Sequence, residues 1–367
     1  MTGGLLLQPE SHLAPIPVVD IREGGTLRHA RESEARARAL RDTCMAWFPG
    51  FVPSLVPAID HFARRWLERS ESPYVDEVRA IAATLGFPGI WFLNGSYQWS
   101  CTSLACEEDA VPWLARTLDW PFPGLGRYVE IARMCGPAGE FLNVTWPGYV
   151  GALTAVAPGR FAAAINQAPL RRRTRWRALR GYDVAANTVV TLWNVRAIPP
   201  DQLLRQVFET CRDYGEAKLM LQKTPIARPV IYTLAGCLSG ERCVIERTED
   251  SASTRAHDTG AANDWLVGAA RWEARAEPNR MMASTFEEAA AYSRVRREAL
   301  ASWPGNFMRQ SFSWVTPPVL SPFTRLAVEM CPARGTLRLV GYEQTADNQI
   351  AQVATLPCEI KTEQSEA

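Results

Sequence analysis

The chain has 367 residues, of which 47% are hydrophobic and 22% are charged, and its formal net charge is +1. This composition is typical of a globular protein with a sizeable core and excludes a disordered or fibrous chain. The near-neutral charge gives no electrostatic reason to expect nucleic acid, a membrane surface or a polyacid as partner. The length fits one large domain or two ordinary ones.

Nine cysteines and four histidines limit the redox and metal chemistry that the chain can support. The cysteine count is odd and no Cys-x-x-Cys occurs, while the first residues, MTGGLLLQPE, lack the basic stretch of a secretion signal. We therefore expect reduced thiols and a cytoplasmic location. The histidines show no ligand spacing, and no phosphate-binding or dinucleotide fingerprint occurs, so we expect no metal and no cofactor.

The first hundred residues are predicted to be mainly helical, with helices over 28–47, 58–69 and 74–85. An uncharged run, 80–106, follows and is long enough to span a bilayer. Its glycines, proline and amide side chains argue against a spanning helix, because such a helix must satisfy its backbone internally. We expect no membrane span and interpret the run as buried core that leads into a site.

From residue 101 onward the pattern changes to short β-like runs separated by Pro-Gly turns. Their close spacing predicts an antiparallel sheet, since parallel strands would need helical crossovers. The later chain predicts further strands and two helices, and the whole predicts an α+β layered architecture with a helical part, 1–100, on a sheet-rich part, 101–367. The predicted strands are 101–107, 112–118, 127–135, 140–146, 149–157, 160–168, 229–235, 242–247, 264–270, 311–315, 324–330 and 336–342, and the helices 201–222 and 285–302.

A Ser-His-Asp arrangement is excluded, because the histidines stand in ordinary contexts and no Gly-x-Ser-x-Gly turn occurs. The candidates that remain for catalysis are Cys101, Arg116 and Asp119. Strand alternation places Arg116 on an apolar face, where its charge must meet a carboxylate or an anionic ligand. A structural ion pair with Asp119 is the plainer alternative. A buried free cysteine that acts only as a small hydrophobe is the plainer alternative for Cys101.

Several segments resemble one enzyme family, the acid ceramidase and N-acylethanolamine acid amidase group. They are LNGSYQW at 93–99, CTSL at 101–104, ART-LDW at 115–120, GYVGALTAVAPGRFAAAIN at 148–166 and LAGCLSGERCVIER at 234–247. The group belongs to the N-terminal-nucleophile (Ntn) hydrolases, with choloylglycine hydrolases and isopenicillin N acyltransferase as more distant relatives. The resemblance covers roughly residues 85–250.

The resemblance implies a four-layer αββα fold and autocatalytic cleavage between Ser100 and Cys101. Residues 1–100 would then form a helical small chain, and 101–367 a catalytic large chain. The physical chemistry agrees with the scarcity of histidine, because a new α-amino group has a pKa near 7.7–8.0 and can act as base for its own thiol. The implied reaction is hydrolysis of a linear N-acyl amide, such as a fatty-acyl amide, a ceramide-like lipid or an acyl amino acid, through a thioester on Cys101.

Four further roles follow from the resemblance. Arg116 would hold the thiolate, and Asp119 would hydrogen-bond the amino group of Cys101. Asn166 would contact the substrate or the oxyanion, or else be a strand-end amide that bonds a turn. Arg296, preferred to Arg297, matches a family arginine, with a solvated helix charge as the alternative.

Substrate contacts are expected from Trp120, Trp146, Tyr149 and Arg171. The tryptophans near the site suit an apolar acyl pocket, although they are also ordinary core residues. Arg171 opens a cluster of six arginines, RRRTRWRALR at 171–180, which is either an ion-paired surface segment or an attractor for an anionic substrate. A small-molecule acyl amide or lipid is the expected partner.

One departure from the family pattern concerns the oxyanion. The family has a Thr-Asn pair on the strand that follows the hairpin, which is formed here by the predicted strands 229–235 and 242–247. We place Ala269 and Ala270 at the positions of that pair. Losing one oxyanion donor costs about 10²–10³ in rate. Two alternatives therefore stay open, namely an acyltransferase of the isopenicillin N acyltransferase type and a non-catalytic protein that binds acyl groups or lipids.

Overall fold

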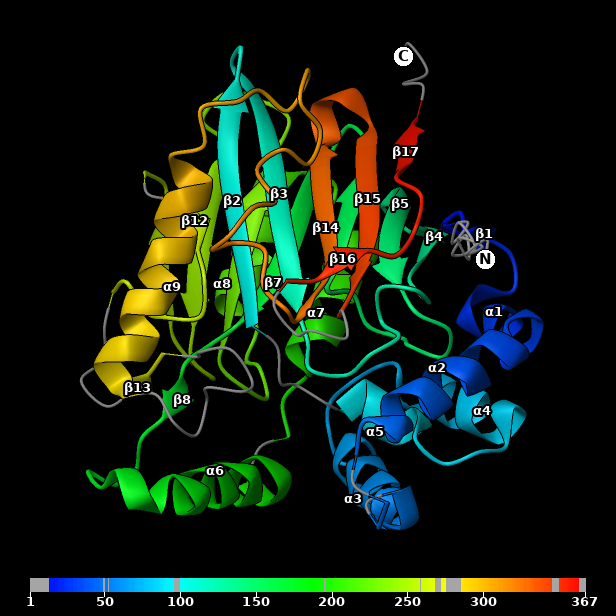
Figure 1. Cartoon of the computed structure of the whole chain (residues 1–367). Coiled ribbons are helices and arrows are strands. Elements are labelled where there is room, and N and C mark those ends of the chain that lie inside the picture. The colour runs from blue at the N-terminus through cyan, green and yellow to red at the C-terminus, as the bar shows by residue number, and fades with distance from the viewer. Residues whose placement is uncertain are drawn as a thin grey trace, which may run out of the picture.

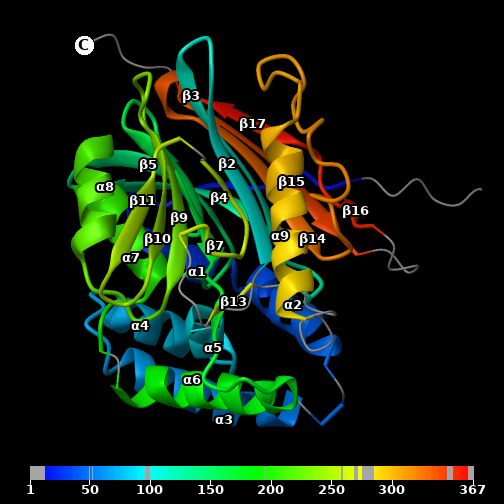
Figure 2. The same ribbon diagram turned by 90° about the vertical axis from the view of Figure 1, so that its left-hand side faces the viewer.

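The protein is described by a computed structural model over residues 13–48, 50–51, 53–95, 100–194, 196–257, 259–267, 272–274, 285–344 and 350–362. Two β-sheets face each other in these residues, and helices cover their outer sides (Figure 1, Figure 2). The expected α+β, four-layer αββα arrangement is confirmed. None of the helices in these ranges has both the length and the apolar composition needed to cross a membrane.

The N-terminal helices lie together at one end of the sheets (Figure 1). They pack on their own cluster of buried residues, which includes Trp66, Val78 and Ile81. The predicted helix over 28–47 is divided at Ser33, and the last helix of the group leads toward the Ser100–Cys101 bond. The helices are α1 (Gly25–Glu32), α2 (Glu34–Ala46), α3 (Val56–Leu67), α4 (Val75–Leu85) and α5 (Ile90–Gly95).

The first sheet has eight strands in the order β1-β4-β5-β6-β7-β9-β10-β11. Its neighbours are antiparallel except for β1 and β4, which pair in parallel, so the N-terminal segment supplies an edge strand. Helices α7 (Pro200–Thr210) and α8 (Tyr214–Lys223) cover its outer face (Figure 2). The strands are β1 (Val18–Asp20), β4 (Glu130–Gly136), β5 (Gly139–Thr145), β6 (Thr154–Ala157), β7 (Phe161–Gln167), β9 (Val230–Ala235), β10 (Arg242–Arg247) and β11 (Ala252–Arg255).

The second sheet has the order β12-β2-β3-β14-β15-β16, with β17 also paired to β15. Helix α9 (Phe286–Ala301) lies against β2 and β12 on its outer face (Figure 1). A small separate pair, β8 (Leu170–Arg171) with β13 (Trp272–Glu273), lies near α6 (Arg180–Asn194). The strands are β2 (Ser100–Glu108), β3 (Val111–Asp119), β12 (Gly260–Ala261), β14 (Thr324–Cys331), β15 (Thr336–Glu343), β16 (Gln352–Val353) and β17 (Cys358–Lys361).

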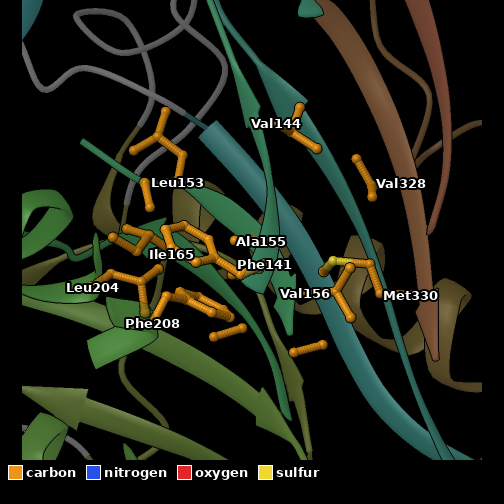
Figure 3. Close-up of a cluster of buried hydrophobic side chains, with 14 of the residues drawn as sticks. Phe141, Val144, Leu153, Ala155, Val156, Ile165, Leu204, Phe208, Val328 and Met330 are labelled. Carbon is orange, nitrogen blue, oxygen red and sulfur yellow. The ribbon is translucent and has the colours of Figure 1, made fainter. Parts of the chain in front are cut away.

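The main core fills the space between the two sheets and continues under α7. Figure 3 shows Phe141, Ile165 and Phe208 packed together, with Val328 and Met330 approaching from the second sheet. Because both sheets turn an apolar face inward, burial of this surface is the dominant force that holds the four layers together. The layers in turn fix the ends of β2 and β3, where Cys101 and Asp119 lie.

Two predicted strands are not formed in the described residues, and in both segments a buried carboxylate accepts backbone N–H groups. Residues 264–267 of the predicted strand 264–270 form bends and irregular backbone, since the Glu246 carboxylate accepts the N–H groups of Leu266 and Val267 at 3.0 and 3.1 Å, and 268–270 lie outside the described residues. Residues 311–314 of the predicted strand 311–315 form turns, because Glu329 accepts both the N–H of Phe312 and the indole N–H of Trp314.

The helix predicted over 201–222 is two helices. Cys211 is extended, and the Asp213 side chain then accepts the N–H of Glu216 at 2.9 Å, which begins α8. An aspartate at a helix N-cap is strongly favoured, so the local sequence stops one helix and starts the next. Helices α5 and α6 and the short strands β1, β8, β11, β12, β13, β16 and β17 were not predicted.

Candidate active site

The Ser100–Cys101 bond lies at the beginning of β2, and both residues are buried. In the antiparallel β2–β3 pair, Ser100 is opposite Asp119 and Cys101 is opposite Leu118. Because side chains alternate along a strand, Cys101 and Arg116 share one face, whereas Ser100 and Asp119 share the other. One hairpin therefore presents the thiol and guanidinium to the first sheet and the carboxylate to α9.

The Cys101 thiol is in direct contact with Arg116. The guanidinium Nη2 donates to Sγ at 2.9 Å and to the carbonyl of Ile165 at 3.1 Å, while Nη1 donates to the hydroxyl of Thr154. Within the described part of the chain, Arg116 has no carboxylate within salt-bridge distance. The alternative of an ion pair between Arg116 and Asp119 is therefore not realised, and this cation is directed at the sulfur.

Arg296 reaches the same bond from α9 and is fully buried. Its Nη1 donates to the Cys101 carbonyl at 3.1 Å, to the Thr102 hydroxyl at 3.2 Å and to Asp119 Oδ2 at 3.3 Å. The alternative of a solvated helix charge is excluded for Arg296. Arg297 instead pairs with Asp264 at 2.9 Å, away from these contacts.

Asn263 completes the cluster and was not predicted. Its Oδ1 accepts the backbone N–H of Cys101 at 2.8 Å, the Ser100 hydroxyl at 3.1 Å and Arg296 Nη2 at 2.9 Å. Asn263 directly precedes Asp264, the first residue of the predicted strand 264–270. An asparagine was therefore present one residue before the segment that was searched for it. Ala269 and Ala270, where an asparagine was expected and judged missing, lie outside the described residues.

Asn166 is fully buried but touches the segment that carries Asn263. Its Nδ2 donates to the carbonyls of Ala261 and Ala262 at 3.1 and 3.2 Å, and the next carbonyl on β7, that of Gln167, accepts Nδ2 of Asn263 at 2.9 Å. The end of β7 thus anchors residues 261–263. This geometry matches the strand-end amide that was the alternative for Asn166.

The four residues expected to contact substrate hold other partners in the uncleaved chain. Trp146 Nε1 donates to the Leu125 carbonyl at 2.7 Å, and Trp120 packs edge-on against Phe122. The Tyr149 hydroxyl donates to Asp201 at 2.7 Å, and Arg171 pairs with Glu249 at 3.0 Å. Trp120 lines an apolar cavity. The cavity walls also include Leu40 and Met45 from α2, Ile90, Phe92 and Leu93 from α5, and Phe122 and Leu125.

In the arginine cluster at 171–180, three of the six arginines, Arg171, Arg172 and Arg180, pair with carboxylates among the described residues. Arg172 bonds Asp183 and Glu273 at 2.7 and 2.9 Å, and Arg180 also bonds Glu273. Arg173 Nε donates to Asn187 at 2.8 Å. These contacts agree with the alternative of an ion-paired segment.

Burial governs the charge state of the nucleophile candidate. It raises the pKa of the Cys101 thiol, as does the nearby Asp119 carboxylate, whereas Arg116 and Arg296 lower that pKa. The thiol form therefore prevails in the uncleaved chain, and a base is needed to make the thiolate. Among the described residues, no three His, Cys, Asp or Glu side chains come together as a metal site.

No family model matches the chain. Among curated proteins, the N-acylethanolamine-hydrolyzing acid amidase of Cavia porcellus is 26% identical over 239 residues, which are 63% of this chain and 60% of that protein. The acid ceramidase of Homo sapiens is 36% identical over 219 residues, 54% of this chain and 53% of that protein. The chain is similar in sequence to both of these proteins. The resemblance inferred from its motifs is confirmed.

The chain thus matches between about half and six-tenths of the length of these curated relatives. Among solved structures, the Caenorhabditis elegans ortholog of the same acid amidase is 20% identical with a TM-score of 0.45, covering 64% of this chain and 93% of that one. A mutant of the conjugated bile acid hydrolase from Clostridium perfringens is 11% identical with a TM-score of 0.38, covering 72% and 97%. Since both scores are below 0.5, the αββα assignment depends on the sheet order and layers described above.

Proposed function

We propose that the chain is a self-processing cysteine amidohydrolase that cleaves a linear N-acyl amide through a thioester on Cys101. One observation carries the proposal: the buried Ser100–Cys101 bond is surrounded by Arg116, Arg296 and Asn263, which contact the thiol, the carbonyl and the N–H of Cys101. A structural cysteine would not require two buried cations and an amide directed at its own atoms.

The first step would be self-cleavage. Sγ of Cys101 attacks the Ser100 carbonyl carbon, the C–N bond breaks, and the thiol proton passes to the nitrogen of Cys101. Water then hydrolyses the resulting thioester, which gives a Ser100 carboxylate and a free Cys101 with an α-amino group. Asn263 supports this step because its bond to the Cys101 N–H holds the scissile peptide in one orientation.

Turnover would use the new α-amino group as the base. It takes the thiol proton, the thiolate attacks the substrate carbonyl, and the amine leaves with that proton before water releases the acid. Arg116, 2.9 Å from Sγ, stabilises the thiolate, and Asp119 holds the charge state of the amino group. The alternative of a non-catalytic protein was motivated by the asparagine judged missing at Ala269 and Ala270. Because Asn263 places an amide beside Cys101, that motive no longer applies.

A fatty-acyl amide is the proposed substrate class. The curated relatives are named for N-acylethanolamines and ceramide. The apolar cavity is lined by Trp120, the residue that follows Asp119 in the sequence. Its walls offer apolar surface with few polar groups, which suits a hydrocarbon chain. Transfer of the acyl group to an amine instead of water is the second outcome of the same thioester, and product analysis with added amines distinguishes the two.

The division into a small chain, 1–100, and a large chain, 101–367, belongs to this proposal, because it follows from cleavage at Ser100. The parallel β1–β4 pair and the buried contact of His29 with Glu130, 2.6 Å long, would keep the two chains together. A cytoplasmic location is also proposed and is supported by nine free thiols. Fractionation of the producing cells tests it.

Intact-mass analysis of the purified chain tests the proposal. We expect two species that sum to the full chain plus one water, and a single uncut species in Cys101→Ala. Cys106→Ala is the matched control, since Cys106 lies on the same strand and should process normally. A thiol-directed acyl probe should label the wild type and the control but not Cys101→Ala. A chain that stays uncut at acidic and neutral pH, without labelling, would refute the proposal.

A further inference from the structure

Thr324 is a buried hydroxyl at the first position of β14, beside the end of β3. It pairs with Asp119, but the register between β14 and β3 shifts between Thr324 and Leu326. Such an irregularity bends the strand and redirects a side chain that regular pairing would point elsewhere. Here the redirected side chain meets the Asp119 carboxylate.

The orientation of the Thr324 hydroxyl is fixed by two hydrogen bonds. Its oxygen accepts the backbone N–H of Ser321 at 2.9 Å and donates to Asp119 Oδ1 at 2.8 Å. A hydroxyl has a single hydrogen, and the N–H of Ser321 occupies an acceptor position, so that hydrogen is directed at the carboxylate. Because donation to a carboxylate favours its charged form, Thr324 stabilises ionised Asp119.

Asp119 is therefore held at both oxygens by residues distant in the sequence. Oδ1 receives Thr324, 205 positions away, and Oδ2 lies 3.3 Å from Nη1 of Arg296, which also bonds the Cys101 carbonyl. The same Nη1 of Arg296 is shared among three acceptors, so it restrains the carboxylate less than a donor with a single acceptor would. The Thr324 hydroxyl gives the second fixed point.

We propose that Thr324 is a positioning residue for the reaction at Cys101, which fixes the rotation of the Asp119 carboxylate and keeps it ionised opposite the scissile bond. The inference rests on the proposed function, in which Asp119 sets the charge state of the Cys101 amino group. Among the described residues, the charged and titratable groups around Asp119 include Arg296 from α9, Cys101 from β2 and Arg325 from β14, with Arg116 beyond the thiol. Thr324 is a neutral partner of the carboxylate.

The test compares Thr324→Val with Thr324→Ser and with Thr117→Val. Valine keeps the shape of threonine and removes the hydroxyl, whereas serine keeps the hydroxyl. Thr117 lies on β3, is equally buried, and its hydroxyl has no hydrogen-bond partner among the described residues, so Thr117→Val controls for the loss of a buried hydroxyl. The first readout is the pKa of Asp119 in the full chain, from ¹³C-carboxyl NMR with labelled aspartate, assigned by loss of the signal in Asp119→Asn.

We expect Thr324→Val to raise the proton affinity of Asp119 about tenfold, or one pKa unit, since one charge-assisted hydrogen bond is lost. Thr324→Ser should restore the wild-type value and Thr117→Val should keep it. In turnover, the acid limb of the kcat profile should move to higher pH in Thr324→Val only, because Asp119 must be ionised to act.

An unchanged Asp119 pKa in Thr324→Val would overturn the inference, and so would a uniform fall in kcat with no shift of the acid limb. The titration needs no catalysis. A wild-type chain that neither processes nor turns over would therefore count against the proposed function, while the effect of Thr324 on Asp119 is still read from the titration.

Discussion

Replacing Asn263 by alanine tests the amide that the sequence did not reveal. The substitution removes the bonds of Oδ1 to the Cys101 N–H, the Ser100 hydroxyl and Arg296, at 2.8, 3.1 and 2.9 Å, and that of Nδ2 to the Gln167 carbonyl, at 2.9 Å. Arg296 keeps Asp119 as a partner, whereas the buried Cys101 N–H loses its acceptor. Three neutral hydrogen bonds and one charged one together give a loss of about 3–7 kcal/mol in the free energy of unfolding.

The substitution should also slow self-cleavage in molecules that are still folded, beyond any effect of the lower stability. Because the amide orients the scissile peptide in the proposed step, its removal should slow cleavage about 10²-fold. Cleavage is followed by intact mass over time, at a temperature where circular dichroism shows that the variant is folded. Asn143→Ala is the control, because Asn143 is also buried and its Nδ2 donates to the Gly151 carbonyl at 3.1 Å. Wild-type cleavage in folded Asn263→Ala, or equal slowing in Asn143→Ala, would refute this reasoning.

Two predictions concern stability. Burial raises the pKa of Asp201 from 3.8 to about 7, so the folded state binds more protons than the unfolded state between these values and loses stability as pH rises through them. Asp201→Asn keeps an acceptor for the Tyr149 hydroxyl and should remove this fall in stability. Measured by urea unfolding, the free energy of unfolding of the variant should exceed that of the wild type by up to about 4 kcal/mol above pH 7 and equal it near pH 4. An equal difference at both pH values would contradict this expectation. A Cβ at Gly126 would overlap the carbonyl oxygen of Tyr342, so Gly126→Ala should lower the free energy of unfolding by at least about 2 kcal/mol, whereas Gly181→Ala, with open space around it, should be neutral or stabilising by up to about 1 kcal/mol. Similar thermal midpoints for the two alanine variants would show that the loop at Gly126 adapts.

Alternation along 112–118 placed Arg116 on an apolar face, and the family resemblance implied the roles of Cys101 and Asp119 in the local half of the candidate site. Cys101, Arg116 and Asp119 lie on two strands joined by a tight turn, so their faces follow from the period of a strand. The same regularity predicted most strands of both sheets, because one apolar face must turn inward in each. The layered fold followed from the order of these elements and from the resemblance.

Side chains decided the segments that the pattern predicted wrongly. Glu246 and Glu329 accept backbone N–H groups of 266–267 and 312, and no periodicity in those segments reveals an acceptor supplied by another strand. A hydrogen bond of about 3 Å depends on how distant elements pack, which hydrophobic patterning does not encode.

The distant half of the candidate site was decided in the same way by the tertiary structure. Asn263 and Arg296 bond Cys101 from 162 and 195 positions away, and Thr324 bonds Asp119 from 205 positions away. The sequence by itself indicated the nucleophile candidate through its resemblance to the amidase family, and the α+β class of fold through local period and composition. Only the packing of α9, the 260–263 segment and the irregular start of β14 against one hairpin decided which polar groups surround the Ser100–Cys101 bond, because a buried polar group is stable only where the folded chain brings it a partner.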